Sequence, residues 1–254
     1  MTQFAEMSFD SVAQVLAKRP EWDMLTPHTE TSPVDGDQHT NFEIVHDPAF
    51  PNSPVIQNTW GDGFGDRTLW PGTAGRSGGT RLRKHQSNSG WQEAYISFLL
   101  RLDPAFSSGP VGYKVIGVMN GRNARQMLWV LITGSNHKWQ LDQKIFKDDG
   151  QDLPAGSPRQ VNAGGASAVF NTIQQIELYT KLCSGAGVAD GIFTLWVAGV
   201  QRIHVTNIVN YTNLLGRAST ADEIGGITLD PIPSTRNPSP ENWLRYDDLY
   251  MSVK

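Results

Sequence analysis

Alternating apolar and polar residues mark several stretches of the chain as β-strands. The segment WQEAYISFLLRLDP alternates with a period of two from Ile96 to Leu102, and IQQIELYTKL does so from Ile176 to Leu182. A period of two places successive side chains on opposite faces of a strand. We therefore predict that each segment is a strand with one buried face.

Further segments extend this pattern along the chain. FEIVH alternates from Phe42, whereas YKVIGVM from Tyr113 and MLWVLITG from Met127 are nearly continuous apolar runs, as in central strands. WLRYDDLYMSV predicts a last strand, and the connections are rich in Gly, Pro, Ser and Asn. About a dozen short strands predict an all-β fold, namely a two-sheet antiparallel jelly-roll sandwich over residues 41–254.

Residues 1–40 follow a different pattern. Within 8–19, apolar residues recur at helical spacing until Pro20 ends the pattern. We predict a short N-terminal helix followed by an extended polar arm. The helix packs either on its own domain or on a neighbouring subunit, and the predicted assembly residues are Phe9, Val12, Val15 and Leu16.

The stretch ADGIFTLWVAGVQRIHV predicts a hairpin with a two-residue turn at Ala198–Gly199. Regular pairing from this turn puts Trp196 and Ile203 on the face that we predict to be the core. It puts Arg202 and His204 on the other face, where they line a half-open groove or a subunit contact.

Composition and charge narrow the classes of partner. The formal charge is −4, from 21 basic and 25 acidic residues, so we expect no nucleic-acid partner. No run approaches the roughly 20 apolar residues of a membrane span, and no signal peptide is apparent, so we expect synthesis in the cytoplasm. Cys183 is the one cysteine, and the histidines show no paired metal spacing, so we expect no disulfide, metal or cofactor.

The quoted segments resemble the concanavalin-A-like jelly-roll domains, and most closely their polysaccharide-lyase-like members. The resemblance covers 79–253 and rests on WQEAYISFLLRLDPAF, IELYTKL, DGIFTLWVAGVQRIHVTN and WLRYDDLYMSV, in the family's order. Ala198 stands where the family commonly has a turn Asp. The family's RxELR strand corresponds to GTRLRKH, without its acidic residue, and its QIH strand to KVIGVMNG.

The resemblance implies a polysaccharide lyase as one reading of the function. β-Elimination beside a uronate needs a cation that neutralises the carboxylate, a base for the C5 proton and an acid for the leaving oxygen. The candidates for these roles are Arg83, His85, Tyr179, Arg202 and His204, with Arg81, Tyr113, Lys114 and Lys181 beside them.

A binding module is a second reading, because exposed Trp side chains stack on sugar rings. The candidate glycan-binding residues are Trp70, Trp91, Arg202 and His204.

The main prediction is a third reading, in which the chain is a non-enzymatic structural or surface protein of a virus- or phage-like particle. Jelly rolls are common building units of such particles, and N-terminal arms lock neighbouring subunits together. We therefore expect a capsid-decoration or tail component on a virion surface, with self-association or capsid and tail partners bound through the arm, and glycan binding as an added role.

Overall fold

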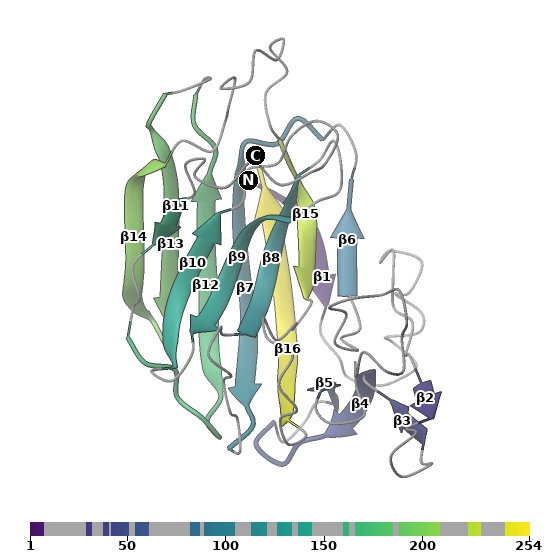
Figure 1. Cartoon of the computed structure of the whole chain (residues 1–254). Coiled ribbons are helices and arrows are strands. Elements are labelled where there is room, and N and C mark those ends of the chain that lie inside the picture. The colour runs from purple at the N-terminus through teal and green to yellow at the C-terminus, as the bar shows by residue number, and fades with distance from the viewer. Residues whose placement is uncertain are drawn as a thin grey trace.

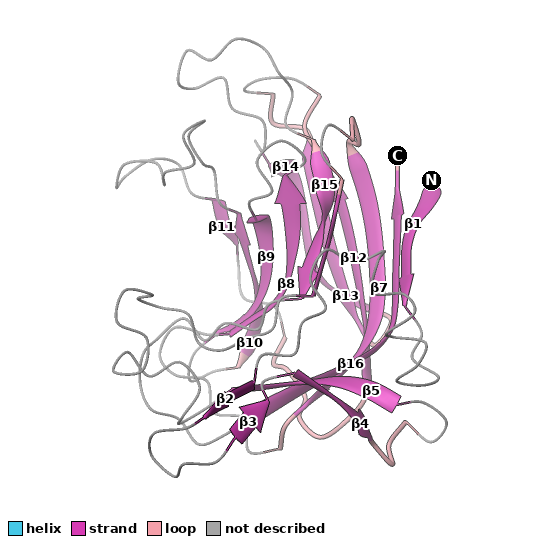
Figure 2. Ribbon diagram, turned by 90° about the vertical axis from the view of Figure 1, so that its right-hand side faces the viewer, coloured by secondary structure: helices cyan, strands magenta, loops and turns pink. Residues whose placement is uncertain are grey.

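The computed structural model describes residues 1–7, 29–31, 38–40, 42–50, 54–60, 82–86, 89–104, 113–120, 126–133, 137–143, 160–162, 166–184, 188–208, 223–229 and 242–254. Every element within these ranges is a β-strand. The strands form two large antiparallel sheets that face each other (Figures 1 and 2). A third, two-stranded sheet consists of β2 (Thr29–Thr31) and β3 (Gln38–Thr40).

The first large sheet has eight strands. Its spatial order is β14 (Val200–Ile208), β13 (Gly191–Val197), β12 (Gln174–Lys181), β7 (Glu93–Leu102), β16 (Asn242–Val253), β5 (Pro54–Trp60) and β4 (Phe42–His46). The eighth strand, β1 (Thr2–Met7), pairs with the C-terminal half of β16, whose N-terminal half pairs with β5. The long last strand is thus flanked on one side by β7 and on the other by β1 and β5.

The second large sheet has six strands. Its spatial order is β11 (Gln160–Asn162), β10 (Lys138–Gln143), β9 (Gln126–Thr133), β8 (Tyr113–Asn120), β15 (Ile224–Leu229) and β6 (Leu82–His85). Strand β15 lies between β8 and β6 although more than 100 residues separate it from either in sequence.

The inner faces of the two sheets meet in one hydrophobic core. Strand β7 buries every second residue, as its alternation predicts, and β12 does the same. Phe98 packs against Tyr246 within the eight-stranded sheet, and the Tyr246 hydroxyl donates to the Val115 carbonyl of the other sheet, at 3.2 Å. The predicted all-β jelly-roll sandwich is therefore confirmed. The predicted helix at 8–19 lies outside the described residues, and the domain boundary at residue 40 stays a prediction.

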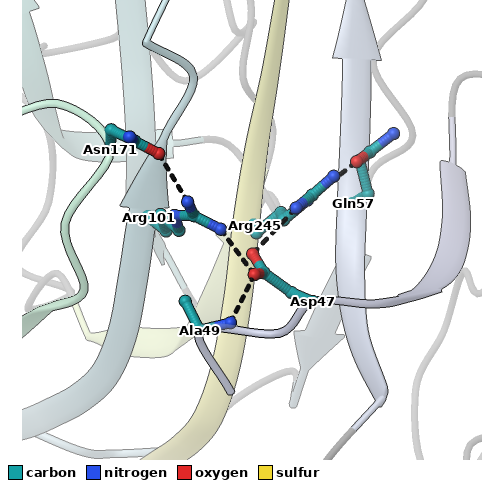
Figure 3. A network of polar contacts seen from close by, with 6 residues as sticks. All are labelled: Asp47, Ala49, Gln57, Arg101, Asn171 and Arg245. Carbon is teal, nitrogen blue, oxygen red and sulfur yellow. Dashed lines mark hydrogen bonds and ion pairs between the residues drawn. The ribbon is translucent and has the colours of Figure 1, made fainter. Parts of the chain in front are cut away.

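Two arginines face each other on neighbouring strands at one end of the eight-stranded sheet (Figure 3). Arg101 of β7 pairs directly with Arg245 of β16. Like charges in this position repel each other. Asp47, which directly follows β4, bonds to both guanidinium groups, with 2.8 Å between its Oδ2 and Nη1 of Arg245. We call these three residues the arginine clamp.

Further contacts tie the arginine clamp to other parts of the chain. Gln57 accepts a hydrogen bond of 2.8 Å from Nε of Arg245, and Asn171 accepts one from Arg101. The indole of Trp243 lies 4.0 Å from the Arg245 guanidinium carbon, which is a cation–π distance. The clamp therefore fastens β4, β5, β7, β16 and the segment before β12 to one another.

The Asp47 carboxylate is fully buried, at 0% exposure. Burial raises the pKa of this carboxyl, but hydrogen bonds from Arg245, Arg101 and the Ala49 N–H outweigh burial and hold the pKa below its ordinary value of 3.8. A depressed folded-state pKa stabilises the fold above the unfolded-state pKa, and this stabilisation is lost as the pH falls through the folded-state pKa.

We expect Asp47→Asn to lower the free energy of unfolding by about 3–5 kcal/mol at pH 7, because it leaves two facing cations without their counter-charge. Denaturant titration at pH 7 measures this loss. The difference between the variant and the parent should shrink as the pH falls from about 4 toward 2, where the parent's carboxylate protonates. A difference that stays constant across this range would contradict the proposed charge interaction.

The hairpin between β13 and β14 turns at Ala198 and Gly199, as predicted from the sequence. Both have positive φ, at 51° and 73°, which is the backbone of a type I′ turn. Ala198 is strained there, because a Cβ disfavours the left-handed region. A Cβ at position 199 would meet nothing within 4 Å. A substitution of Gly199 would therefore change stability only through the strain of its left-handed backbone conformation.

We expect Ala198→Asn to raise the free energy of unfolding by about 0.5–1 kcal/mol, because Asn tolerates the left-handed region better than Ala. Gly199→Ala, the matched control, should lower it by about 1 kcal/mol for the converse reason. Equilibrium unfolding in urea measures both changes. Equal stabilities for all three chains would show that this turn relaxes out of the left-handed region.

Candidate functional site

The two sides of the six-stranded sheet are distinguished by alternation along β8 and β9. Val118 and Val130 belong to the hydrophobic core. Their sequence neighbours Gly117 and Trp129 therefore lie on the outer side of the sheet. Gly117 pairs with Trp129 on one side and with Thr228 of β15 on the other. These three residues form a row across the outer side.

Gly117 is required by the packing of this row. A Cβ at position 117 would lie 2.8 Å from Cζ3 of Trp129 and 3.0 Å from Cγ2 of Thr228. The indole thus lies against the backbone of β8, where only glycine fits. An isolated glycine inside an apolar strand pattern is a sequence signal for such an approach, and our sequence analysis did not use it.

Thr228 has a buried hydroxyl with unused hydrogen-bonding capacity. Its side chain is 0% exposed, and within the described part of the chain its Oγ1 has no hydrogen-bond partner. A buried polar group without a partner destabilises a fold by roughly 1–3 kcal/mol. The unpartnered hydroxyl therefore lowers the stability of the six-stranded sheet.

Strand β6 brings two basic positions to this side of the sheet. Arg83 pairs with Thr228, and His85 pairs with Gly226. Cross-strand partners lie on the same face of a sheet, so Arg83 continues the row formed by Thr228 and Gly117. His85, two residues farther along the strand, lies on the same side.

A third basic position comes from β8. An irregularity leaves Val115 without a partner in the β8–β9 register, so Lys114 pairs with Leu131 and Tyr113 with Ile132. Leu131 is two residues from Trp129, so the Lys114 position is on the outer side, while the Tyr113 position is on the side of the core residue Ile132. We call the outer-side positions the six-stranded face: Arg83, His85, Lys114, Gly117, Trp129 and Thr228.

The six-stranded face differs in exposure along its length. Trp129 and Thr228 are buried, whereas Leu131 and its cross-strand partner Gln140 are half-buried. On β9 and β10, the described outer-side residues that solvent reaches are Leu131, Gln140 and the exposed Lys138, two residues before Gln140. A ligand approaching the face from this edge meets these residues first.

The β13–β14 hairpin departs from the register predicted beyond its turn. Trp196 pairs with Gln201 as predicted, but Leu195 pairs with Ile203 instead of Arg202. Arg202 is thus the extra residue of a β-bulge, and the bulge moves Ile203, His204 and Val205 to the face opposite to that of regular pairing.

The prediction of which hairpin face is buried was wrong for this reason. Phe193, Leu195 and Val197 are buried core residues, whereas Trp196 is half-buried on the outer face. His204 is exposed on that outer face, with its Nδ1 2.9 Å from Oγ1 of Thr194.

Tyr179 also lies on the outer side of the eight-stranded sheet. Its hydroxyl donates a hydrogen bond of 3.1 Å to Oε2 of Glu93. Burial first, and this carboxylate second, raise the pKa of Tyr179, which disfavours the phenolate that a proton-abstracting base needs. The five lyase candidates are therefore divided between two sheets: Arg83 and His85 lie on the six-stranded sheet, and Tyr179, Arg202 and His204 on the eight-stranded sheet.

The other candidates are placed as follows. Trp91 packs edge-to-face on Phe4, with 4.5 Å between ring centroids, and lies against the core. This contact attaches the N-terminal strand β1 to the sandwich. Trp70 and the assembly residues Phe9, Val12, Val15 and Leu16 lie outside the described residues.

The described residues contain neither a candidate metal site nor a candidate membrane-spanning helix. They contain no group of three or more His, Cys, Asp or Glu side chains placed to hold a metal ion. Within the same residues, no helix has the length and apolar character needed to span a membrane.

Solved structures with the same fold match this chain over its whole length. An endo-β-1,4-glucuronan lyase from the fungus Trichoderma reesei matches with a TM-score of 0.62 and 13% identity, covering 100% of this chain and 96% of that one. Alginate lyase vAL-1 from Chlorella virus matches at 0.63 and 12%, covering 98% and 100%. The PL-14 alginate lyase from Aplysia kurodai matches at 0.63 and 11%, covering 100% of both chains. No protein-family model and no curated protein sequence matches.

These neighbours correct the main functional prediction. The expected non-enzymatic component of a virus-like particle was wrong, because the matching structures are polysaccharide lyases, which was the alternative reading. The expectation that the chain is not an enzyme has no support from them either. Capsid proteins and lyases share the jelly-roll architecture, so the architecture alone did not separate the two readings. The chain shares the jelly-roll fold of these lyase structures.

Proposed function

We propose that this chain is a polysaccharide lyase that cleaves a uronate-containing polymer by β-elimination on the six-stranded face. The observation that carries the proposal is the strand register that brings the Arg83, His85 and Lys114 positions to one side of one sheet. The full-length likeness to glucuronan and alginate lyases supports it.

The three basic positions match the chemical needs of the reaction. The Arg83 guanidinium, a fixed cation, neutralises the uronate carboxylate and thereby acidifies the C5 proton. His85 or Lys114, as a neutral base, takes that proton. The electron pair forms the C4–C5 double bond while the C4–O bond to the neighbouring sugar breaks. The leaving oxygen takes a proton from the conjugate acid of the base.

The eight-stranded sheet is a poorer place for this reaction. The Tyr179 hydroxyl donates a hydrogen bond to Glu93, and its pKa is raised. Arg202 is exposed at the bulge of β14, and His204 bonds to Thr194. A uronate on this side would also meet the carboxylates of Glu93 and Glu177.

We expect the protein to release unsaturated uronate products from glucuronan or alginate, detected by the ultraviolet absorbance of the new double bond. Arg83→Ala should lower kcat/KM by about 100-fold or more, because the carboxylate then lacks its counter-charge. Arg202→Ala, a matched control on the other sheet, should stay within about twofold of the parent. Absence of product from a panel of uronate polymers, or full activity of Arg83→Ala, would refute the proposal.

We also expect Thr228→Val to stabilise the fold. The variant replaces an unpartnered buried hydroxyl by a methyl group of similar size, so the free energy of unfolding should rise by up to about 1 kcal/mol. Because no part of Thr228 is exposed, kcat/KM should stay within about twofold of the parent. Thermal unfolding and steady-state kinetics on one preparation measure both. A loss of activity in the folded variant would show that substrate reaches this hydroxyl.

A further inference from the structure

The outer side of the eight-stranded sheet carries a cluster that the proposed reaction does not use. It lies mainly on β7 and β12, the two central strands (Figure 1). Its aromatic and acidic members are half-buried, so solvent reaches all of them. We call this cluster the tyrosine face: Glu93, Tyr95, Glu177, Tyr179, Trp196 and Tyr250.

The two central tyrosines are held in a crossed arrangement. Tyr95 and Tyr179 are direct cross-strand partners. The Tyr95 hydroxyl donates to Oε1 of Glu177, and the Tyr179 hydroxyl donates to Oε2 of Glu93. Each carboxylate is the diagonal neighbour of its tyrosine on the other strand. A phenol that reaches a diagonal neighbour leans along the sheet instead of standing away from it, so the two rings lie over β7 and β12.

The phenols remain uncharged over the whole neutral range. Burial, and next the hydrogen bond to Glu177, raise the pKa of Tyr95 to about 12. Burial and the Glu93 carboxylate raise the pKa of Tyr179 in the same way. The face therefore presents two neutral aromatic rings whose orientation is fixed by hydrogen bonds.

Two further aromatic side chains extend the tyrosine face on either side. The Tyr250 ring of β16 lies 6.5 Å from the Tyr95 ring, centroid to centroid. Trp196 of β13 is the cross-strand partner of Glu177. Aromatic side chains thus occur on four adjacent strands, with carboxylates between them.

We propose that the tyrosine face binds a neutral polysaccharide chain, at a site separate from the six-stranded face. Sugar rings have apolar C–H faces, which stack on aromatic rings, and hydroxyl edges, which donate hydrogen bonds to carboxylates. The tyrosine face offers both kinds of group on four adjacent strands. Fixed rings also lose little conformational freedom on binding.

The carboxylates of the tyrosine face favour a glycan over an apolar protein surface. Cations lie beside them, because Lys181 is the cross-strand partner of Glu93 and the Lys254 ammonium lies 3.7 Å from Oε1 of Glu93. An apolar protein surface would remove these charged carboxylates from water, which is costly. A neutral glycan satisfies them with its hydroxyls. This inference is independent of the lyase proposal.

Affinity electrophoresis in native gels tests the inference, with a soluble neutral β-glucan in one gel and alginate in another. The full chain should be retarded by the neutral glucan. Tyr95→Ala/Tyr179→Ala should weaken that binding by about tenfold or more, because two stacking rings are lost. Tyr95→Phe/Tyr179→Phe, which keeps both rings, should bind within about threefold of the parent.

Circular dichroism melting establishes that each variant is folded at the temperature of the gel. Unretarded migration of the full chain in the neutral glucan would overturn the proposal. Equal retardation of the folded Ala variant and the parent would place the glycan elsewhere and overturn it too. Light scattering gives a further test: a dimer that the Ala substitutions dissociate would show that the tyrosine face binds a second copy of the chain instead.

Discussion

The eight-stranded sheet depends on the way it neutralises two facing arginines. Arg101 and Arg245 are cross-strand partners near one end of β7 and β16, and the buried carboxylate of Asp47 bonds to both (Figure 3). Because Asp47 follows β4 directly, these bonds hold the β4–β5 hairpin against the two long strands. The eight-stranded sheet covers one side of the core and the six-stranded sheet covers the other. The six-stranded face is the side of the six-stranded sheet that points away from the core.

Sequence alternation predicted most of this fold but not the places where a β-bulge shifts the strand register, of which β14 and β16 give two examples. The alternation in β7 and β12 correctly assigned their buried residues. In β16, Asp248 has a φ of 48° and interrupts the pairing with β7. Tyr246 and Leu249 are therefore both buried although their positions differ by three. Arg202 does the same in β14. A bulge residue has no periodic signature, so only the paired structure reveals it.

The candidate site was predictable only in part, because its residues meet through long-range pairing. The sequence pointed to Arg83 and His85 through a family resemblance, but it also selected Tyr179, Arg202 and His204, which lie on the other sheet. Strand β15 pairs with both β6 and β8, and no local pattern encodes these partners. The functional prediction failed for a related reason, since strand and turn residues specify an architecture that enzymes and particle proteins share.

The bulge at Arg202 also bears on strand pairing between molecules. Strand β14 ends the strand order of the eight-stranded sheet within the described part of the chain, so it is a site for edge-to-edge pairing. An extra, charged residue twists the strand locally and interrupts the row of backbone donors and acceptors that another chain would need. The same residue that changes the hairpin register thereby makes this edge a poorer template for edge-to-edge pairing.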